Sequence, residues 1–367
     1  MQDPRVEKLA KVLVEYSLEV KKGDLMIIQA TDIAAPMVRA VYREAMRAGA
    51  HVTTRVAVEG LDEIFFKEAS EDQLTYVSEF RKVENEKATV MLNLWGGFNP
   101  KNLTAVDPKR MAVTQKAHFE ISKRFMERTA KGELRWCGTM FPNHASAQEA
   151  EMSLAEYEDF VFQSCFVDKP DPVAEWKRVA REQERIVQFL SKKKAIKVEG
   201  KDTDLTISVA GRKWINCCGQ KNMPDGEVFT GPVEDSAQGR IRYTYPAVYG
   251  GKEVVDVRLE FKDGRVTEAR AEKGQELLQT MIAMDEGAKR IGEFAIGTNY
   301  GVQRFTKNTL FDEKIGGTIH LALGFSIPES GGVNQSGIHW DMVCDLKEGG
   351  RIYADGEKFY EDGKFLI

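Results

Sequence analysis

The first third of the chain alternates short apolar runs with a segment of helical periodicity. Residues 24–30 (DLMIIQA) form an apolar run of strand length, and Asp32 with Pro36 then marks the start of a helix. Residues 51–58 (HVTTRVAV) return to a β-rich pattern. A strand, a helix and a strand in about 35 residues have the size of a right-handed βαβ unit with parallel strands. Two more runs of strand length follow at 90–95 and 134–140, so the pattern predicts an N-terminal α/β layered domain with parallel strands.

Helical spacing then continues before the pattern changes to strands. Pro172 stands where the first residue of a long helix is expected. From Ala195 onward the chain is mostly strands and turns, interrupted by one helix expected over residues 275–291. This change predicts an α/β protein of two domains. They are an N-terminal α/β domain with a helical bridge over residues 1–192 and a C-terminal strand-rich α+β domain over residues 193–367.

Charge and composition narrow the class of protein. The 52 Lys and Arg residues against 57 Asp and Glu residues give a net charge of −5, so no basic field favours a nucleic-acid partner. No stretch approaches the roughly 18 uncharged apolar residues of a spanning helix, and the first residues lack the apolar core of a signal peptide. Five scattered cysteines fit thiols in a reducing compartment better than a disulfide framework. We therefore expect a folded cytoplasmic protein without a membrane or nucleic-acid partner.

No common local motif reveals the chemistry of the chain. We find no P-loop, no G-x-G-x-x-G, no H-E-x-x-H and no G-x-S-x-G, so any site is dispersed along the sequence. The clearest candidates are histidines in strand-like runs. His320 faces away from the apolar residues of 318–323, and His339 and Asp341 share the polar face of 338–344. Imidazole and carboxylate are favoured ligands of zinc and similar ions, while a hydrogen-bonded His–Asp pair on a half-exposed sheet is the alternative.

Two glutamates stand at junctions between expected elements. Glu227 follows the turn at 223–226, and Glu293 follows the end of the helix expected over 275–291. Each is next to apolar residues, where a buried carboxylate is costly unless it is paired. Salt-bridged or exposed glutamates are the common alternative, and the residues alone leave the choice open.

Four segments, taken in order, resemble one known family. They are residues 223–230 (MPDGEVFT), 291–299 (IGEFAIGTN), 309–324 (TLFDEKIGGTIHLALG) and 339–341 (HWD). Together they are similar to the thermophilic-type metallo-aminopeptidases, the aminopeptidase T- and S-like family. Residues 152–160 and the N-terminal strand–helix unit also resemble that family, so the resemblance runs essentially from end to end.

The resemblance implies a metal-dependent aminopeptidase with a two-metal site in the C-terminal domain. Two divalent ions of zinc, cobalt or manganese would be held by five residues that correspond position by position: Glu227, Glu293, His320, His339 and Asp341. Glu227 or Glu293 would also act in catalysis as the bridging or proton-handling carboxylate. The family further implies short peptide substrates with a free N-terminus, and a homodimer.

The chain departs from the family at one position. The family tyrosine that follows the first histidine corresponds here to Ile327. An aliphatic side chain neither binds metal nor donates a proton, so we expect slow turnover unless a hydroxyl of Ser326 or Tyr300 substitutes. Two other hypotheses therefore stay open. One is a metal- or peptide-binding homologue with weakened or lost peptidase activity, and the other is a single-iron, ring-cleaving dioxygenase that uses His320, His339 and Asp341.

Overall fold

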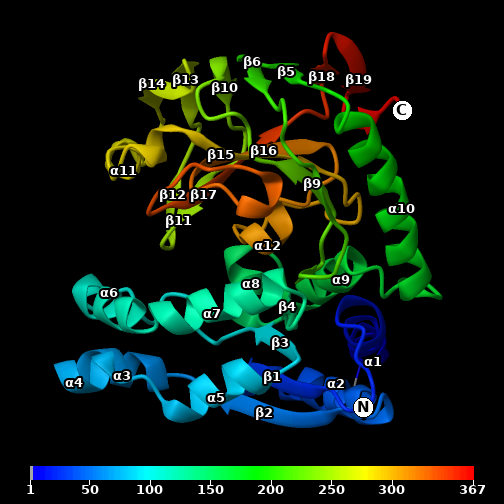
Figure 1. The fold of residues 1–367 in the computed structure, drawn as a ribbon, viewed down its shortest axis with the longest axis vertical. Coiled ribbons are helices and arrows are strands. Elements are labelled where there is room, and N and C mark those ends of the chain that lie inside the picture. Colours follow the sequence, from blue (N-terminus) through cyan, green and yellow to red (C-terminus); the bar gives the residue numbers. More distant parts are fainter. Residues whose placement is uncertain (1–2) are drawn as a thin grey trace. The chain divides into compact units, whose positions relative to one another are not determined.

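The computed structural model describes residues 3–367, which divide into two units (Figure 1). The first unit holds the chain up to Val173 and the short segment Gly219–Met223. The second unit holds Ala174–Cys218 and Pro224–Ile367. Each unit has its own sheet structure, in agreement with the predicted fold class.

The long helix α10 (Pro172–Leu190) joins the second unit along most of its length. Its side chains Ile186 and Leu190 are buried in the apolar core of that unit. The sequence instead placed the boundary at residues 192/193, after this helix. The two units divide at the opposite end of the helix because its apolar face packs on the strands that come after it in the chain.

The first unit is built on a parallel five-stranded sheet of order β2–β1–β3–β4–β8. Ile28 and Leu92, in the two central apolar runs, are fully buried, as expected for a parallel sheet covered on both faces. This sheet confirms the predicted N-terminal α/β domain. The strands are β1 (Leu25–Thr31), β2 (His51–Ala57), β3 (Val90–Trp95), β4 (Arg135–Met140) and β8 (Asn222–Met223).

Helices surround this sheet and connect its strands. Pro4 and Pro108 stand in the first turns of α1 and α6, where the lack of an amide proton costs nothing. The helices are α1 (Pro4–Val12), α2 (Ala35–Arg47), α3 (Leu61–Glu68), α4 (Glu71–Thr75), α5 (Glu79–Lys87), α6 (Pro108–Ala117), α7 (Phe119–Ala130), α8 (His144–Glu149) and α9 (Leu154–Ser164).

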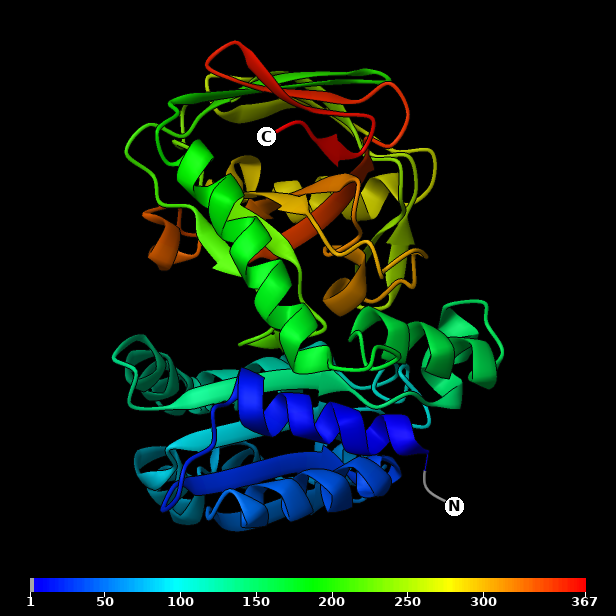
Figure 2. The same cartoon turned by 90° about the vertical axis from the view of Figure 1, so that its right-hand side faces the viewer.

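The second unit contains two larger antiparallel sheets, which lie as layers in both views (Figures 1 and 2). The eight-stranded sheet has the order β14–β13–β10–β6–β5–β18–β19–β20. Its strands are β5 (Ala195–Gly200), β6 (Thr203–Ser208), β10 (Gln238–Arg242), β13 (Arg258–Lys262), β14 (Arg265–Arg270), β18 (Arg351–Ala354), β19 (Glu357–Glu361) and β20 (Lys364–Phe365).

The five-stranded sheet of the second unit has the order β17–β16–β15–β9–β7. One apolar core holds side chains of both sheets, such as Leu205 and Leu259 from one and Phe294 and Leu321 from the other. The strands are β7 (Ile215–Cys217), β9 (Glu227–Thr230), β15 (Ile291–Gly297), β16 (Thr318–Gly324) and β17 (His339–Asp345), and a separate hairpin pairs β11 (Ala247–Tyr249) with β12 (Lys252–Val254).

The helix expected over residues 275–291 is shorter in the structure. Helix α11 spans Gln275–Ile282, and Ile291 already begins strand β15. The Asp285 side chain accepts hydrogen bonds from the backbone amides of Ala288 and Gly337. These bonds stabilise a turn at a position where the sequence pattern had predicted helix. Helix α12 (Thr309–Asp312) also belongs to this unit. Among the described helices, none combines the length and apolar character needed to cross a membrane.

Candidate metal centre

Four neighbouring strands of the five-stranded sheet bring the predicted site residues together. In β16, Ala322 pairs with Glu293 of β15 on one side and with Asp341 of β17 on the other. His320 is two residues before Ala322, so its side chain projects from the same face of the sheet. Two further pairs extend this face, Gly297 with Glu227 and Gly324 with His339. Register therefore places all five predicted residues on one face, opposite the apolar core.

A bulge at Gly292 turns Glu293 onto this face. The pairing register between β15 and β16 shifts between Ile291 and Glu293. In a regular strand these two residues would share a face, but with the bulge Ile291 packs in the core and Glu293 faces the histidines. A Cβ atom at position 292 would lie 2.3 Å from the carbonyl oxygen of Gly324, so the bulge requires glycine.

Glu293 lies between the two histidines. Its Oε1 is 3.3 Å from His320 Nε2, and its Oε2 is 3.7 Å from His339 Nε2. Glu227 Oε2 also lies 3.4 Å from His320 Nε2, and Asp341 Oδ1 lies 3.5 Å from His339 Nε2. The five residues thus form two overlapping sets of three, each with ligand atoms within 4.8 Å of one another, and the two sets share Glu293.

Several ligand atoms of this cluster are buried without a hydrogen-bond partner. Within residues 3–367, none is found for Glu227 Oε2, Glu293 Oε2 or Asp341 Oδ1, and none for Nδ1 of His320, the ring nitrogen that does not contact the glutamates. Unpaired polar atoms in a buried site destabilise the fold, and carboxylate burial is costly above all. A divalent cation is the group that carboxylate and imidazole ligands bind together. The residues present therefore fit a metal site.

The ring of His339 is oriented by the backbone. Its Nδ1 lies 2.7 Å from the carbonyl oxygen of Phe325. Because a carbonyl oxygen only accepts hydrogen bonds, Nδ1 must carry the proton, and the Nε2 lone pair of the neutral ring then faces Glu293 and Asp341. This arrangement is the one that a metal-binding histidine needs.

The charges of the cluster shift the pKa values of its members. Burial lowers the pKa of His320, but the hydrogen bond to Glu293 and the charge of Glu227 raise it to about 9 overall. Burial also lowers the pKa of His339, but the nearby charge of Asp341 raises it to about 10. Burial raises the pKa of Glu293. The negative cluster thus favours positive charge at the histidines, and ion binding would displace those protons.

Sequence analysis missed a lysine in this cluster. Lys314 follows α12, its side chain is only 1% exposed, and its Nζ lies 2.6 Å from Glu227 Oε1. The same Nζ lies 2.8 Å from Glu313 Oε2. Burial raises the pKa of Glu313 to about 8, against the lowering effect of the Lys314 charge. A Glu–Lys pair is typical of a surface turn, and no spacing or alternation in the sequence marks this one as buried.

Ile327 lies just beyond β16, half-buried at the start of a short 3₁₀ turn at Pro328–Ser330. Of the two hydroxyls that could substitute for the family tyrosine, that of Tyr300 donates to the carbonyl oxygen of Gly363, 2.8 Å away. The Ser326 hydroxyl is buried and has no partner among the described residues. Of these two hydroxyls, only that of Ser326 lacks a hydrogen-bond partner within the described residues, so it is the better candidate to replace the family tyrosine.

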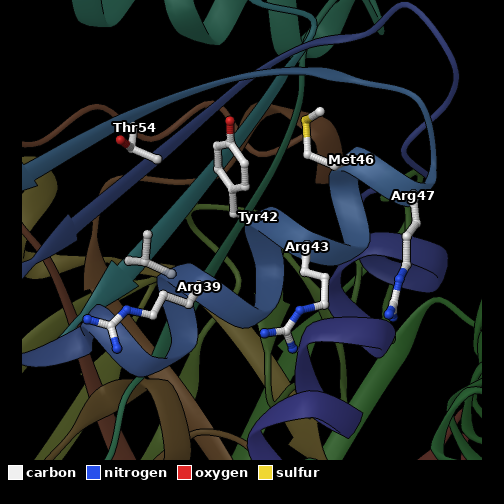
Figure 3. A pocket seen from close by; sticks show the side chains of 7 residues that line it. Arg39, Tyr42, Arg43, Met46, Arg47 and Thr54 are labelled. Carbon is white, nitrogen blue, oxygen red and sulfur yellow. The ribbon is translucent and has the colours of Figure 1, made fainter.

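A hollow on the first unit is unrelated to these residues. It lies along α2, where Arg39, Arg43 and Arg47 recur at four-residue spacing and point to the side of the helix opposite Tyr42 (Figure 3). Arg43 pairs with Glu7, and Arg47 pairs with Glu44 of its own helix. No predicted site residue lines this hollow. The candidate site therefore remains the cluster on the five-stranded sheet.

A comparison with protein-family models decides the family. The model described as thermophilic metalloprotease (M29) matches residues 2–365. The chain belongs to this metalloprotease family. The family resemblance predicted from the sequence is confirmed, and so is a metallopeptidase of the hydrolase class. Membership also implies a divalent metal cofactor.

Relatives of known name match along nearly their whole length. Aminopeptidase 2 of Geobacillus stearothermophilus is 29% identical, and the match covers 97% of this chain and 96% of that protein. Aminopeptidase T of Thermus thermophilus is also 29% identical, over 98% of this chain and 95% of the relative. The solved structure of wild-type AmpT from Thermus thermophilus superposes with a TM-score of 0.86 at 26% identity, covering 99% of each chain. This similarity confirms the predicted fold class.

Proposed function

We propose that the protein is a two-metal aminopeptidase that removes N-terminal residues from short peptides. The observation that carries the proposal is the set of buried, unpartnered ligand atoms on one face of the five-stranded sheet. The names of the relatives that match over nearly the whole chain support the same activity. The proposal keeps the expectation of a cytoplasmic enzyme without a membrane or nucleic-acid partner.

Five residues would hold the ions, which we expect to be zinc, cobalt or manganese. Glu293 belongs to both ligand sets, so the five residues would together offer ligands for two ions. A single-iron dioxygenase would need only two histidines and one carboxylate. It would not account for the two glutamates that are buried beside His320. The full set of ligands is Glu227, Glu293, His320, His339 and Asp341.

When bound, divalent ions of this kind polarise a peptide carbonyl, activate a water molecule and help to anchor the free α-amino group. We assign catalytic roles to Glu293 and Glu227. Both oxygens of Glu293 face histidines, and Glu227 Oε2 faces His320 from the neighbouring strand. A carboxylate at this place can accept a proton from the attacking water and return it to the leaving amine.

Blocked peptides provide the first test. We expect unblocked short peptides to be trimmed stepwise from the amino end and their N-acetylated versions to be inert, because the site must engage a free α-amino group. Product analysis by mass spectrometry, together with metal analysis of the same preparation, measures both. Internal cutting of a blocked peptide would refute the exopeptidase proposal. Metal binding without turnover on any aminoacyl substrate would favour a binding protein, and oxygen uptake with a dihydroxylated ring would favour the dioxygenase.

The proposal includes a homodimer formed through the first unit. Its helices carry large exposed apolar side chains, among them Phe80 on α5, which is 82% exposed, and Met126 on α7, which is 61% exposed. The helices α5 and α7 contact each other, so these side chains belong to neighbouring elements. Exposed apolar residues in such numbers are typical of a surface that another chain covers.

Sedimentation velocity tests the dimer. We expect wild type to sediment as a dimer and Phe80→Glu to shift it toward monomer, because a buried charge in an apolar interface is unfavourable. Leu366→Glu is the control, since Leu366 is 54% exposed on the second unit, and it should leave the dimer intact. A monomeric wild type at micromolar concentration would contradict the proposed dimer.

A further inference from the structure

A buried lysine lies directly against one of the two ligand sets. The Lys314 side chain is 1% exposed, and its Nζ lies 2.6 Å from Glu227 Oε1 and 2.8 Å from Glu313 Oε2. Its distance to Asp225 Oδ1 is 3.9 Å. All four residues belong to the second unit. A cation of the chain itself is thus built into the site, from the loop between α12 and β16.

Lys314 forms a hydrogen bond with one oxygen of Glu227, and the other oxygen remains available to an ion. Oε1 contacts Lys314 Nζ, while Oε2 faces His320 and has no hydrogen-bond partner within the described chain. A further group of possible ligands, Cys217 with Asp225 and Glu227, lies close enough together for an ion, and Lys314 already contacts both of its carboxylates. The ammonium group therefore serves as the cation on this side of Glu227.

In the described part of the chain, no lysine or arginine pairs with Glu293 or Asp341 of the second ligand set. Among residues 3–367, the ion pairs of Lys314 go to Asp225, Glu227 and Glu313 and do not reach Glu293 or Asp341. An ion bound by Glu227, Glu293 and His320 would share the Glu227 carboxylate with a positive charge. An ion bound by Glu293, His339 and Asp341 would not. Like charges that share one buried carboxylate repel strongly, because the low local dielectric screens them little.

We propose that Lys314 makes the two ion positions unequal, so that the position at Glu293, His339 and Asp341 fills first and the position at Glu227, Glu293 and His320 binds its ion more weakly. This inference rests on the proposed two-ion site. Lys314 touches no substrate in this argument and acts on the ion through Glu227.

A metal titration tests the inference without measuring activity. The protein is stripped with a chelator and titrated with Co²⁺, while equilibrium dialysis counts the bound ions and the visible spectrum of Co²⁺ reports each step. We expect wild type to bind two ions in separate steps, the second at least about tenfold more weakly. In Lys314→Met, which keeps the length of the side chain without its charge, the second step should tighten by about tenfold or more.

Two more variants serve as controls. Glu313→Gln should titrate close to wild type, because burial keeps most of Glu313 protonated at neutral pH and the substitution then removes little charge. Lys358→Met is the second control, since Lys358 pairs with Glu361 at the surface of the same unit, and it should titrate as wild type. Circular dichroism checks folding. If Lys314→Met does not fold, Lys314→Gln, which also lacks the charge but can donate hydrogen bonds, replaces it.

The outcomes separate this inference from the proposed function. Two equal steps in wild type, or a weaker second step in Lys314→Met, would overturn the role of Lys314 and leave the two-ion site in place. A single ion in every folded variant would overturn both this inference and the proposed two-ion site. No bound ion in wild type would overturn both the inference and the proposed metal site.

Discussion

Replacing His339 or Asp341 by alanine should remove bound metal and peptidase activity together. Both side chains belong to one ligand set, and His339 Nε2 and Asp341 Oδ1 lie 3.5 Å apart. Loss of either leaves the ion of this set with too few protein ligands for a closed coordination shell. We expect metal affinity to fall at least about 100-fold, since even outer partners of a metal ligand contribute 10- to 100-fold. Inductively coupled plasma mass spectrometry of the dialysed proteins measures the loss, and an aminoacyl substrate measures the activity.

A surface histidine gives the matched control for this experiment. His51 is exposed at the start of β2 in the first unit, so His51→Ala should keep both metal and activity. The His339→Asn variant adds a second check, because it removes the imidazole with a smaller change in volume. Unchanged metal content in both Ala variants would refute the assignment of His339 and Asp341 as ligands. Metal retained with activity lost would show that these residues act in catalysis and are not needed as ligands.

The polar face of the site was predictable from strand alternation where the strands are regular. In β17 the alternation put His339 and Asp341 on one face and Trp340 and Met342 on the other, and the structure has this arrangement. The same rule held for His320 in β16. These positions were accessible because a side chain in a regular strand needs only its parity to be assigned to a face.

Glu293 and Lys314 could not be placed by strand alternation. Ile291 and Glu293 have the same parity, and only the bulge at Gly292 puts them on different faces, so alternation alone could not place Glu293 on the face of the histidines. The resemblance to a family supplied that residue. Lys314 was missed by both routes, because its burial depends on contacts with Glu227, 87 positions away in the sequence. Short-range patterns carry no information on such a pair.

The domain boundary shows the same limit at a larger scale. The composition changes after α10, yet the helix packs against the strands of the second unit, because Ile186 and Leu190 complete the core there. Segment Gly219–Met223 returns to the first unit, where the two-residue strand β8 pairs with β4. Two residues are too few to show a period. The parallel sheet itself was predictable because its apolar runs are long and are separated by a helix.

Replacing Ile327 by tyrosine should raise peptidase turnover. A phenol at the family position could donate a hydrogen bond to a developing oxyanion, and the loss of one such donor costs about 100- to 1000-fold in turnover. Ile327 is half-buried beside a short turn, so the larger ring has partial access to solvent and need not be accommodated wholly in the core. Steady-state turnover at equal metal occupancy measures the gain, and thermal unfolding measures the overpacking cost, about 1 to 3 kcal/mol.

The hydroxyl can be isolated from the ring by a matched pair of variants. Ile327→Phe has the ring of tyrosine without its oxygen, so it should carry the same packing cost and none of the gain. Ser326→Ala tests the alternative donor, because the Ser326 hydroxyl is buried and unpartnered within the described residues, whereas Tyr300 is held by Gly363. If Ser326 already substitutes for the phenol, Ser326→Ala should lower turnover in wild type and have little effect in the Ile327→Tyr background. Equal turnover of the Tyr and Phe variants, both folded and metal-loaded, would show that a hydroxyl at position 327 donates no hydrogen bond in the reaction. Isoleucine at this position would then not lower the turnover of the enzyme.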